Sequence, residues 1–263
     1  MENKSTSAYS DILGGTRMWA LWMRLGWEDT KLRYRRSVLG PLWLTLGTGL
    51  MVMGMGFIWS ILWGMKISEY FPYLTAGFIT WQLIMSAVSE GARTYSDQAG
   101  LIHSLPLPLT VHSFRLSIKL MMGFAHNLLV FIVVALIFQV PVTIWTLALF
   151  PGLILIYVNC LWASILLGMI GVRYRDVANI LDVVMGLLVF VTPIVWRAEM
   201  LGSKRIIANL NPFTHYLSII RSPLLGQAPE TMSYVVVLAI TVVGCILALI
   251  TFKRYRGRVA FWV

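Results

Sequence analysis

Charge is scarce in this sequence. Only 12% of its 263 residues are Asp, Glu, Lys or Arg, whereas 58% are hydrophobic. A soluble globular domain carries about 25% charged residues, so a soluble fold of this composition would lack a polar surface. The net charge of +10 would indicate nucleic-acid binding in a soluble protein. Here the basic residues flank long apolar runs, so we expect membrane anchoring and no nucleic-acid partner.

Residues that bind metals or nucleotides are few or unsuitably spaced. Cys160 and Cys245 lie in apolar segments and indicate neither a disulfide framework nor a metal site. The four histidines also lack metal-ligand spacing: His103, His112, His126 and His215. No Gly-x-x-x-x-Gly-Lys-Ser/Thr phosphate loop occurs, so we do not expect this chain to bind ATP in that way. The sequence predicts no catalytic, cofactor-binding or metal-binding residue, and no cleavable signal peptide.

Long uncharged runs predict helices that cross a bilayer, which needs about 20 residues for each helix. Residues 120–172 carry no charge and would extend about 80 Å as one helix. We therefore expect two helices there, with a break at 139–141. The predicted fold is an all-α polytopic membrane protein with six transmembrane helices, at about 38–64, 70–90, 118–138, 144–171, 177–196 and 231–252.

Most of the 21 Lys and Arg residues fall on one side of this six-span arrangement. The positive-inside rule places that side, with both termini, in the cytoplasm. The expected organisation is a cytoplasmic N-terminal segment (1–36), a six-span domain (37–252) and a cytoplasmic tail (253–263). Asp182 is the one acid well inside a span, and we favour a structural ion pair or a cavity position for it over ion coupling.

Two shorter segments have their own patterns. Basic and acidic residues share one face of an N-terminal helix that carries several tryptophans: Arg17, Arg24, Glu28, Lys31 and Arg35. This pattern predicts an amphipathic helix in the membrane interface, and a helix packed on a soluble partner is the alternative. Residues 206–220 are uncharged but too short and too polar to cross. They predict a re-entrant or interfacial helical hairpin on the extracytoplasmic side between spans five and six.

Aromatic residues concentrate near the outer ends of spans one, two and five. Interfacial belts explain many of them in any membrane protein. Sugar rings, however, present C–H faces that stack on aromatic rings, so a passage lined in this way would guide a polysaccharide. The candidate channel residues are Trp59, Tyr73, Phe78, Trp81, Phe190 and Trp196.

Four motifs occur in order along the chain: YRRSVLGPLW from residue 34, GVRYRDV from 171, TPIVW from 192 and NLNP from 209. Each motif is weak alone, but the ordered set extends over nearly the whole chain. Together the motifs resemble the membrane subunits of ABC-2-type polysaccharide exporters, which are the O-antigen, capsule and teichoic acid permeases.

The resemblance implies a homodimer in the bacterial inner membrane that binds two separate ATPase subunits, which hold ATP and Mg²⁺. The polysaccharide, linked to undecaprenyl pyrophosphate, would pass between the two copies among membrane lipids. Candidate residues for coupling to the ATPase are Glu28, Arg93, Asp97, Arg173, Arg175 and Asp176. Candidate pyrophosphate contacts are Arg33, Arg35 and Arg36, for which positive-inside anchoring is the alternative. The gate hairpin would include Asn211, Pro212, His215 and Tyr216.

We therefore expect a transport subunit rather than an enzyme, and we favour O-antigen as the exported glycan. The alternatives are a permease for capsule, teichoic acid, or a smaller lipid or drug. A membrane-embedded enzyme acting on lipid-linked sugars is disfavoured, because the acids are scattered: Glu69 lies outside, Glu90 and Asp97 lie inside, and Asp176 lies at another turn.

Overall fold

The computed structural model describes residues 7–32 and 42–263, and only the backbone of Leu44. In this part of the chain the regular elements are helices, without strands. Among the described residues, five helices are long and apolar enough to cross a membrane. They are α3 (Leu42–Leu62), α4 (Ile67–Ala92), α6 (Thr110–Ile137), α7 (Leu149–Arg173) and α11 (Thr231–Tyr255). The prediction of an all-α polytopic membrane protein is confirmed.

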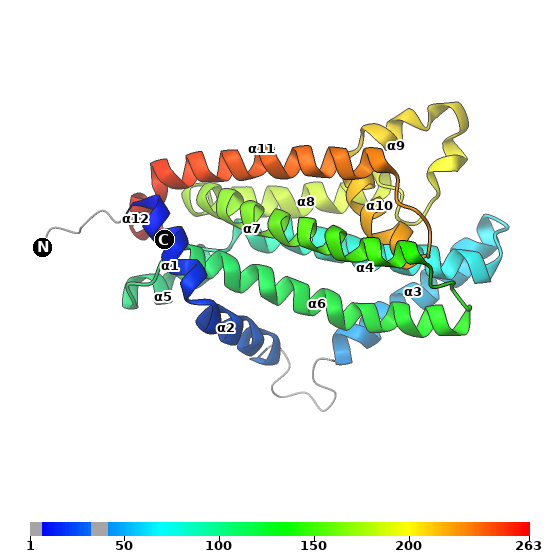
Figure 1. The fold of residues 1–263 in the computed structure, drawn as a ribbon, viewed down its shortest axis with the longest axis horizontal. Coiled ribbons are helices and arrows are strands. Elements are labelled where there is room, and N and C mark those ends of the chain that lie inside the picture. Colours follow the sequence, from blue (N-terminus) through cyan, green and yellow to red (C-terminus); the bar gives the residue numbers. More distant parts are fainter. Residues whose placement is uncertain (1–6, 33–41) are drawn as a thin grey trace, which may run out of the picture.

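The long helices run side by side, and α1 (Ala8–Arg17) and α12 (Val259–Trp262) lie at the same end of the bundle (Figure 1). We call this the α12 end, and we call the opposite end the α9 end. The remaining elements are α2 (Trp19–Leu32), η1 (Ser96–Gln98), α5 (Ala99–Ser104), η2 (Ile144–Ala148), α8 (Asp176–Val191), η3 (Ala198–Lys204), α9 (Ile206–Leu210), α10 (Pro212–Leu224) and η4 (Arg256–Arg258).

Helix α8 is shorter than the expected fifth span. Its 16 residues extend about 24 Å, less than the roughly 30 Å of a hydrocarbon core. The helix stops at Val191 because Pro193 disfavours helical geometry at Thr192, which is extended with φ −92° and ψ 136°. The count of six spans and the domain boundaries stay predictions.

Helix α6 begins earlier than the expected 118. Its first turns follow Pro108 directly and carry polar side chains that indicated a loop. These side chains are buried or paired in the structure: Ser113 and Ser117 are fully buried, and Arg115 and Lys119 form ion pairs. At its other end the predicted break is confirmed, because α6 ends at Ile137 and Gln139 has a positive φ of 52°.

Helix α4 occupies the centre of the bundle and packs against α3, α6, α7, α8 and α10. Glycine permits a close approach between the ends of α4 and α7, since a side chain at Gly171 would overlap the backbone of Ala92. Helix α10 also packs inside the bundle, against α4, α7 and α11, while α9 lies at the bundle end (Figure 1). Helices α9 and α10 form the predicted hairpin segment, and its position relative to a bilayer stays a prediction.

The N-terminal segment forms two helices, with a break at Met18, rather than one. Helix α2 packs on α6, where Trp22 stacks on Phe114 with 5.3 Å between ring centroids. Trp19 and Trp27 remain exposed on α2. An interfacial position for these helices fits that exposure and stays a prediction.

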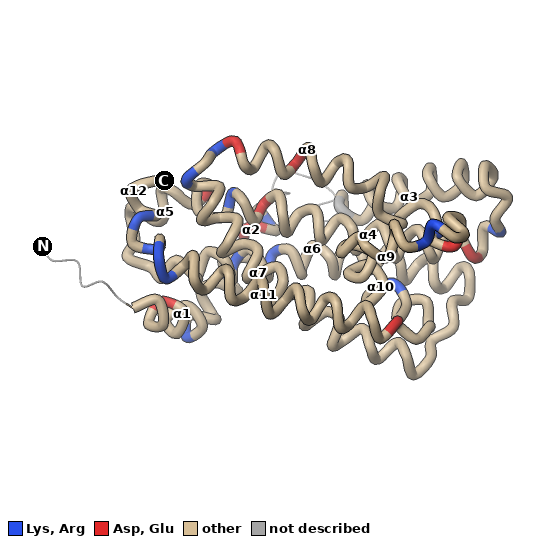
Figure 2. Tube along the Cα trace, turned by 90° about the horizontal axis from the view of Figure 1, so that it is seen from above, with Lys and Arg blue, Asp and Glu red and all other residues tan. Residues whose placement is uncertain are grey.

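The outer surface of the bundle is apolar along the long helices. Large side chains are exposed in series on α11: Val235, Leu238, Val242, Val243, Ile246, Leu247 and Ile250. Charges are displaced to the two ends, with most Lys and Arg at the α12 end and a smaller group beside α9 (Figure 2). A soluble monomer rarely exposes so large an apolar surface, so lipid is the environment that it fits.

Candidate functional site

A cleft opens at the α12 end where three parts of the chain meet. Its volume is about 360 Å³, and it lies between the end of α4 with η1, the turn from α7 to α8, and the last residues of the chain. The lining residues are Ala92, Arg93, Ser96, Asp97, Ala99, Gly171, Val172, Arg175, Ala178, Asn179, Trp262 and Val263. We call this the end cleft.

Three of the predicted coupling residues line the end cleft, namely Arg93, Asp97 and Arg175. Arg173 lies beside it, with its guanidinium 5.4 Å from the ring centre of the lining residue Trp262. Asp176 is exposed in the first turn of α8. Glu28 does not line the cleft and pairs with Lys31 on the exposed side of α2 at 3.6 Å.

An ion pair fixes one wall of the end cleft. Arg93 donates from Nη2 to Asp182 Oδ2 at 2.6 Å and from Nη1 to the Ser89 carbonyl at 3.2 Å. The hydrogen bond to Asp182 raises the pKa of the Arg93 guanidinium further above its ordinary value. Desolvation raises the pKa of Asp97, although Arg93 opposes the shift. The expected ion pair of Asp182 is therefore present, with Arg93 at the end of α4 as its partner.

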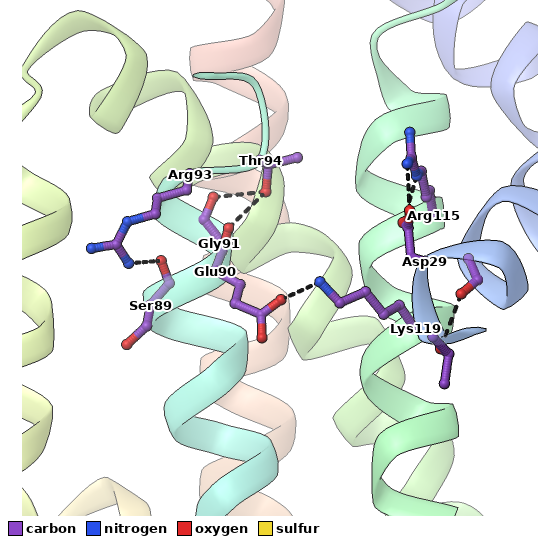
Figure 3. A network of polar contacts seen from close by, with 10 residues as sticks. Asp29, Ser89, Glu90, Gly91, Arg93, Thr94, Arg115 and Lys119 are labelled. Atoms are coloured by element: carbon purple, nitrogen blue, oxygen red, sulfur yellow. Dashed lines mark hydrogen bonds and ion pairs between the residues drawn. The ribbon is translucent and has the colours of Figure 1, made fainter. Parts of the chain in front are cut away.

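Two more ion pairs join helices at this end. Figure 3 shows Glu90 of α4 and Lys119 of α6 pointing toward each other, with 2.6 Å between Oε2 and Nζ. Asp29 of α2 meets Arg115 of α6 at 2.5 Å, and Arg115 also donates to Gln98 Oε1 at 2.6 Å. The segments α2, α4 and α6 are therefore linked to one another through partly buried charges.

The gate residues are held by polar contacts at the α9 end. Asn211 caps α10 by accepting from the Phe213 backbone N–H at 3.0 Å, and Pro212 is the first residue of that helix. The two ring nitrogens of His215 lie 3.0 Å from Ser233 Oγ and 2.8 Å from the Asn209 carbonyl.

Tyr216 completes this set by donating to Asn159 Oδ1 of α7 at 2.6 Å. These contacts tie the predicted gate hairpin to α7 and α11. Its action as a gate stays a prediction.

Tyr73 and Trp196 are brought together by the structure. The Tyr73 hydroxyl donates to the Trp196 carbonyl at 3.1 Å, and the Arg221 guanidinium lies 4.1 Å from the Tyr73 ring centre. Arg221 is buried and donates to the Pro193 carbonyl at 2.8 Å. The sequence analysis assigned no site role to Arg221. The sequence feature that could have indicated it is that Arg221 is the single Lys or Arg in the segment that forms α10.

The other aromatic candidates are dispersed. Trp59 is half-buried and packs on Trp63, and Phe78 is half-buried against the core. Trp81 is 2% exposed and lies edge-on to Phe213, whereas Phe190 is 77% exposed. Lining of a channel by these residues stays a prediction. The headgroup candidates Arg33, Arg35 and Arg36 lie outside the described residues.

Comparison with known proteins shows one family. The ABC-2 type transporter family matches residues 20–225. An "O-antigen export system permease protein RfbA" of Myxococcus xanthus is 25% identical over 215 residues, which cover 78% of this chain and 82% of that protein. Two Klebsiella pneumoniae proteins of the same name are similar. One is 24% identical over 183 residues, covering 67% of this chain and 69% of that protein. The other is 23% identical over 237 residues, covering 87% of this chain and 90% of that protein.

Proposed function

Because this chain belongs to the ABC-2 type transporter family, we propose that it is the membrane subunit of an ATP-driven exporter of a lipid-linked polysaccharide, with an O-antigen as its substrate. The observation that carries the proposal is the alignment with permeases named for O-antigen export over as much as 90% of their length. The alternatives are capsule, teichoic acid, or a smaller lipid or drug as substrate.

We propose that two copies of the chain and two separate ATPase subunits form the working exporter in the inner membrane, with the α12 end in the cytoplasm. The ATPase would bind ATP and Mg²⁺, since the sequence has no phosphate loop. The end cleft supports this assignment. It joins the end of α4, the α7–α8 turn and the C-terminus, so a subunit docked there would act on three elements together.

In the mechanism that we propose, ATP-driven closure of the ATPase pair moves the α7–α8 turn and the end of α4. The Arg93–Asp182 pair transmits this movement to α8, because it bridges the two helices. The segment after α8 and helix α10 then move at the α9 end, and the glycan advances between the two copies. Undecaprenyl pyrophosphate is the expected lipid carrier.

The test is export in a bacterial host that makes a lipid-linked O-antigen but lacks its own exporter. The chain is expressed together with its candidate ATPase subunit, and surface glycan is measured with an O-antigen antibody. Arg175→Glu, which reverses an exposed charge in the end cleft, is expected to lower export about tenfold while the ATPase still co-purifies. Lys204→Glu, at the α9 end, is the matched control and should leave ATPase coupling intact.

Normal export by Arg175→Glu with the ATPase bound would show that the end cleft does not couple the two subunits. Absence of surface glycan with the unsubstituted chain and its ATPase would contradict the O-antigen proposal itself. Export of a capsule or a teichoic acid in a matched host would then identify the alternative substrate.

A further inference from the structure

Helices α4 and α6 face each other with two matching polar stripes. Gln82, Ser86 and Glu90 are spaced by four on α4, and Lys119, Gly123 and Asn127 are spaced by four on α6. Residues four apart lie on one face of a helix. The two helices run in opposite directions (Figure 1), and Glu90 contacts Lys119 while Gln82 contacts Asn127, so the register sets Ser86 opposite Gly123. We call these three pairs the polar ladder.

The two outer pairs of the ladder are closed. The first is the Glu90–Lys119 ion pair at the α12 end (Figure 3). In the last pair Asn127 donates from Nδ2 to Gln82 Oε1 at 2.7 Å. Thr48 of α3 joins that pair by donating to Asn127 Oδ1 at 3.0 Å. The ladder extends about 12 Å along the helices, so it leads from the α12 end into the apolar part of the bundle.

The middle pair is open because position 123 is glycine. A Cβ atom at Gly123 would meet nothing within 4 Å, and Ser86 faces the same space. Both residues line a cavity of about 270 Å³. Its lining is Asp29, Thr30, Thr48, Ile79, Gln82, Leu83, Met85, Ser86, Glu90, Lys119, Leu120, Gly123, Phe124 and Asn127.

Polar groups in a membrane helix are costly unless they pair or serve a ligand. Packing alone would favour closing the gap at position 123 with a side chain, because an empty space forfeits dispersion contacts. The ladder instead leaves an open space between its two closed polar pairs, with the Ser86 side chain beside that space. This combination indicates a site for a bound molecule rather than a tight helix contact.

The chemistry of the lining selects an uncharged, hydroxylated ligand. Among the described residues that line the cavity, the charged side chains are neutralised in pairs, Asp29 with Arg115 and Glu90 with Lys119, so none of these cations is left to hold a phosphate. Deeper in the cavity, amide and hydroxyl groups offer both donors and acceptors. Apolar side chains, with Phe124 among them, form the rest of the wall. A sugar ring has hydroxyl edges and an apolar C–H face, and it matches both kinds of surface.

We propose that the open middle pair of the polar ladder binds one neutral sugar residue of the transported glycan within a single copy of the chain. The inference rests on the proposed function and adds to it a holding site at Ser86 and Gly123. The site lies between α2, α3, α4 and α6. A sugar held there is positioned before it enters a passage between two copies.

The first test fills the cavity. Gly123→Leu is expected to lower surface glycan about tenfold, the scale of one or two lost hydrogen-bonded contacts. Gly186→Leu is the matched control, because Gly186 of α8 also has open space around its Cβ direction but does not line the cavity. Both variants should insert in the membrane and retain the ATPase, as measured by co-purification.

The second test leaves the cavity residues opposite Ser86 unchanged. A diazirine-bearing amino acid replaces Ser86 in the full exporter, and the same amino acid replaces Gly186 as control. Light should produce an adduct at position 86 that an O-antigen antibody recognises, with none at position 186. An adduct that carries only phospholipid, or no adduct, overturns the sugar site.

Wild-type export by Gly123→Leu would overturn the site as well, while leaving the proposed function intact. Failure of the proposed function has a different signature. The unsubstituted chain with its ATPase would then leave the glycan inside the cell, whatever the result at Ser86.

Discussion

The carboxylate of Asp11 connects residues that are far apart in the sequence. It is 3% exposed and accepts from the Leu109 and Thr110 backbone N–H groups, at 3.2 and 3.1 Å, and from the Thr110 hydroxyl at 2.9 Å. Arg256 Nε donates to it at 2.9 Å. One side chain of α1 therefore holds the start of α6 and the region after α11. Asp11 had no role in the sequence prediction, because acids near an N-terminus are usually solvated.

Asp11→Ala should lower the free energy of unfolding by at least about 2 kcal/mol. The substitution leaves two buried backbone donors without their acceptor and removes the ion pair between Asp11 and Arg256. Thermal unfolding of the detergent-purified protein measures the effect. Glu28→Ala removes an exposed acid from an i,i+3 pair and should change stability by less than about 0.5 kcal/mol. Equal stability of the two variants would contradict the role given to Asp11.

At the scale of elements, Arg221 fixes α10 against α4 and the segment after α8. Its guanidinium lies over the ring of Tyr73 and binds the Pro193 carbonyl. Gly77 of α4 provides the space, since a methyl group there would overlap the guanidinium. A buried cation with one carbonyl partner and one aromatic face is held less firmly than a closed ion pair.

The sign of the change in unfolding free energy caused by Gly77→Ala tests this arrangement. Alanine normally stabilises a helix interior by about 1 kcal/mol relative to glycine. Here overpacking should reverse the sign and destabilise by about 1–3 kcal/mol. In an Arg221→Ala background the same substitution should cost much less, since the overlapping group is gone. Chemical unfolding of the four proteins of the double-mutant cycle gives the coupling. Additive effects would mean that Gly77 and Arg221 act independently.

At the scale of the whole molecule, charge and topology agree. Most basic residues lie at the α12 end, and the described segments near both termini lie there too (Figures 1 and 2). An even number of crossings follows if α8 crosses the bilayer despite its 16 residues. After α8 the chain continues into η3 and α9 at the opposite end of the bundle (Figure 1).

Cysteine labelling in spheroplasts checks this topology. Ser203→Cys, in η3, should react with a membrane-impermeant maleimide from outside. Gly100→Cys, in α5, should react only after permeabilisation. The parent protein, with buried Cys160 and half-buried Cys245, is the background control. Labelling of both positions from the same side would contradict the crossing by α8.

Much of the bundle was predictable from the sequence, and the errors have local physical causes. The break at 139–141 was visible because an uncharged run exceeded the thickness of a bilayer. The start of α6 was missed because Arg115 and Lys119 indicated a solvated loop, whereas both are neutralised by partners from other helices. The spacing of four in each polar stripe is visible in the sequence. The pairing of Glu90 with Lys119 is not, because it depends on how the two helices are rotated relative to each other.

Hydropathy by itself determined that this protein is a helical membrane protein, and approximately where its long helices lie. Backbone N–H and C=O groups in lipid must form their hydrogen bonds within their own segment, so an apolar run of sufficient length forms a helix. Only the tertiary structure decided which polar side chains meet, such as Asp182 with Arg93. It also decided which side chains lie beside a glycine, as Arg221 does at Gly77 and Ser86 at Gly123. Those contacts depend on how neighbouring helices are rotated and how closely they pack, and no local pattern encodes either.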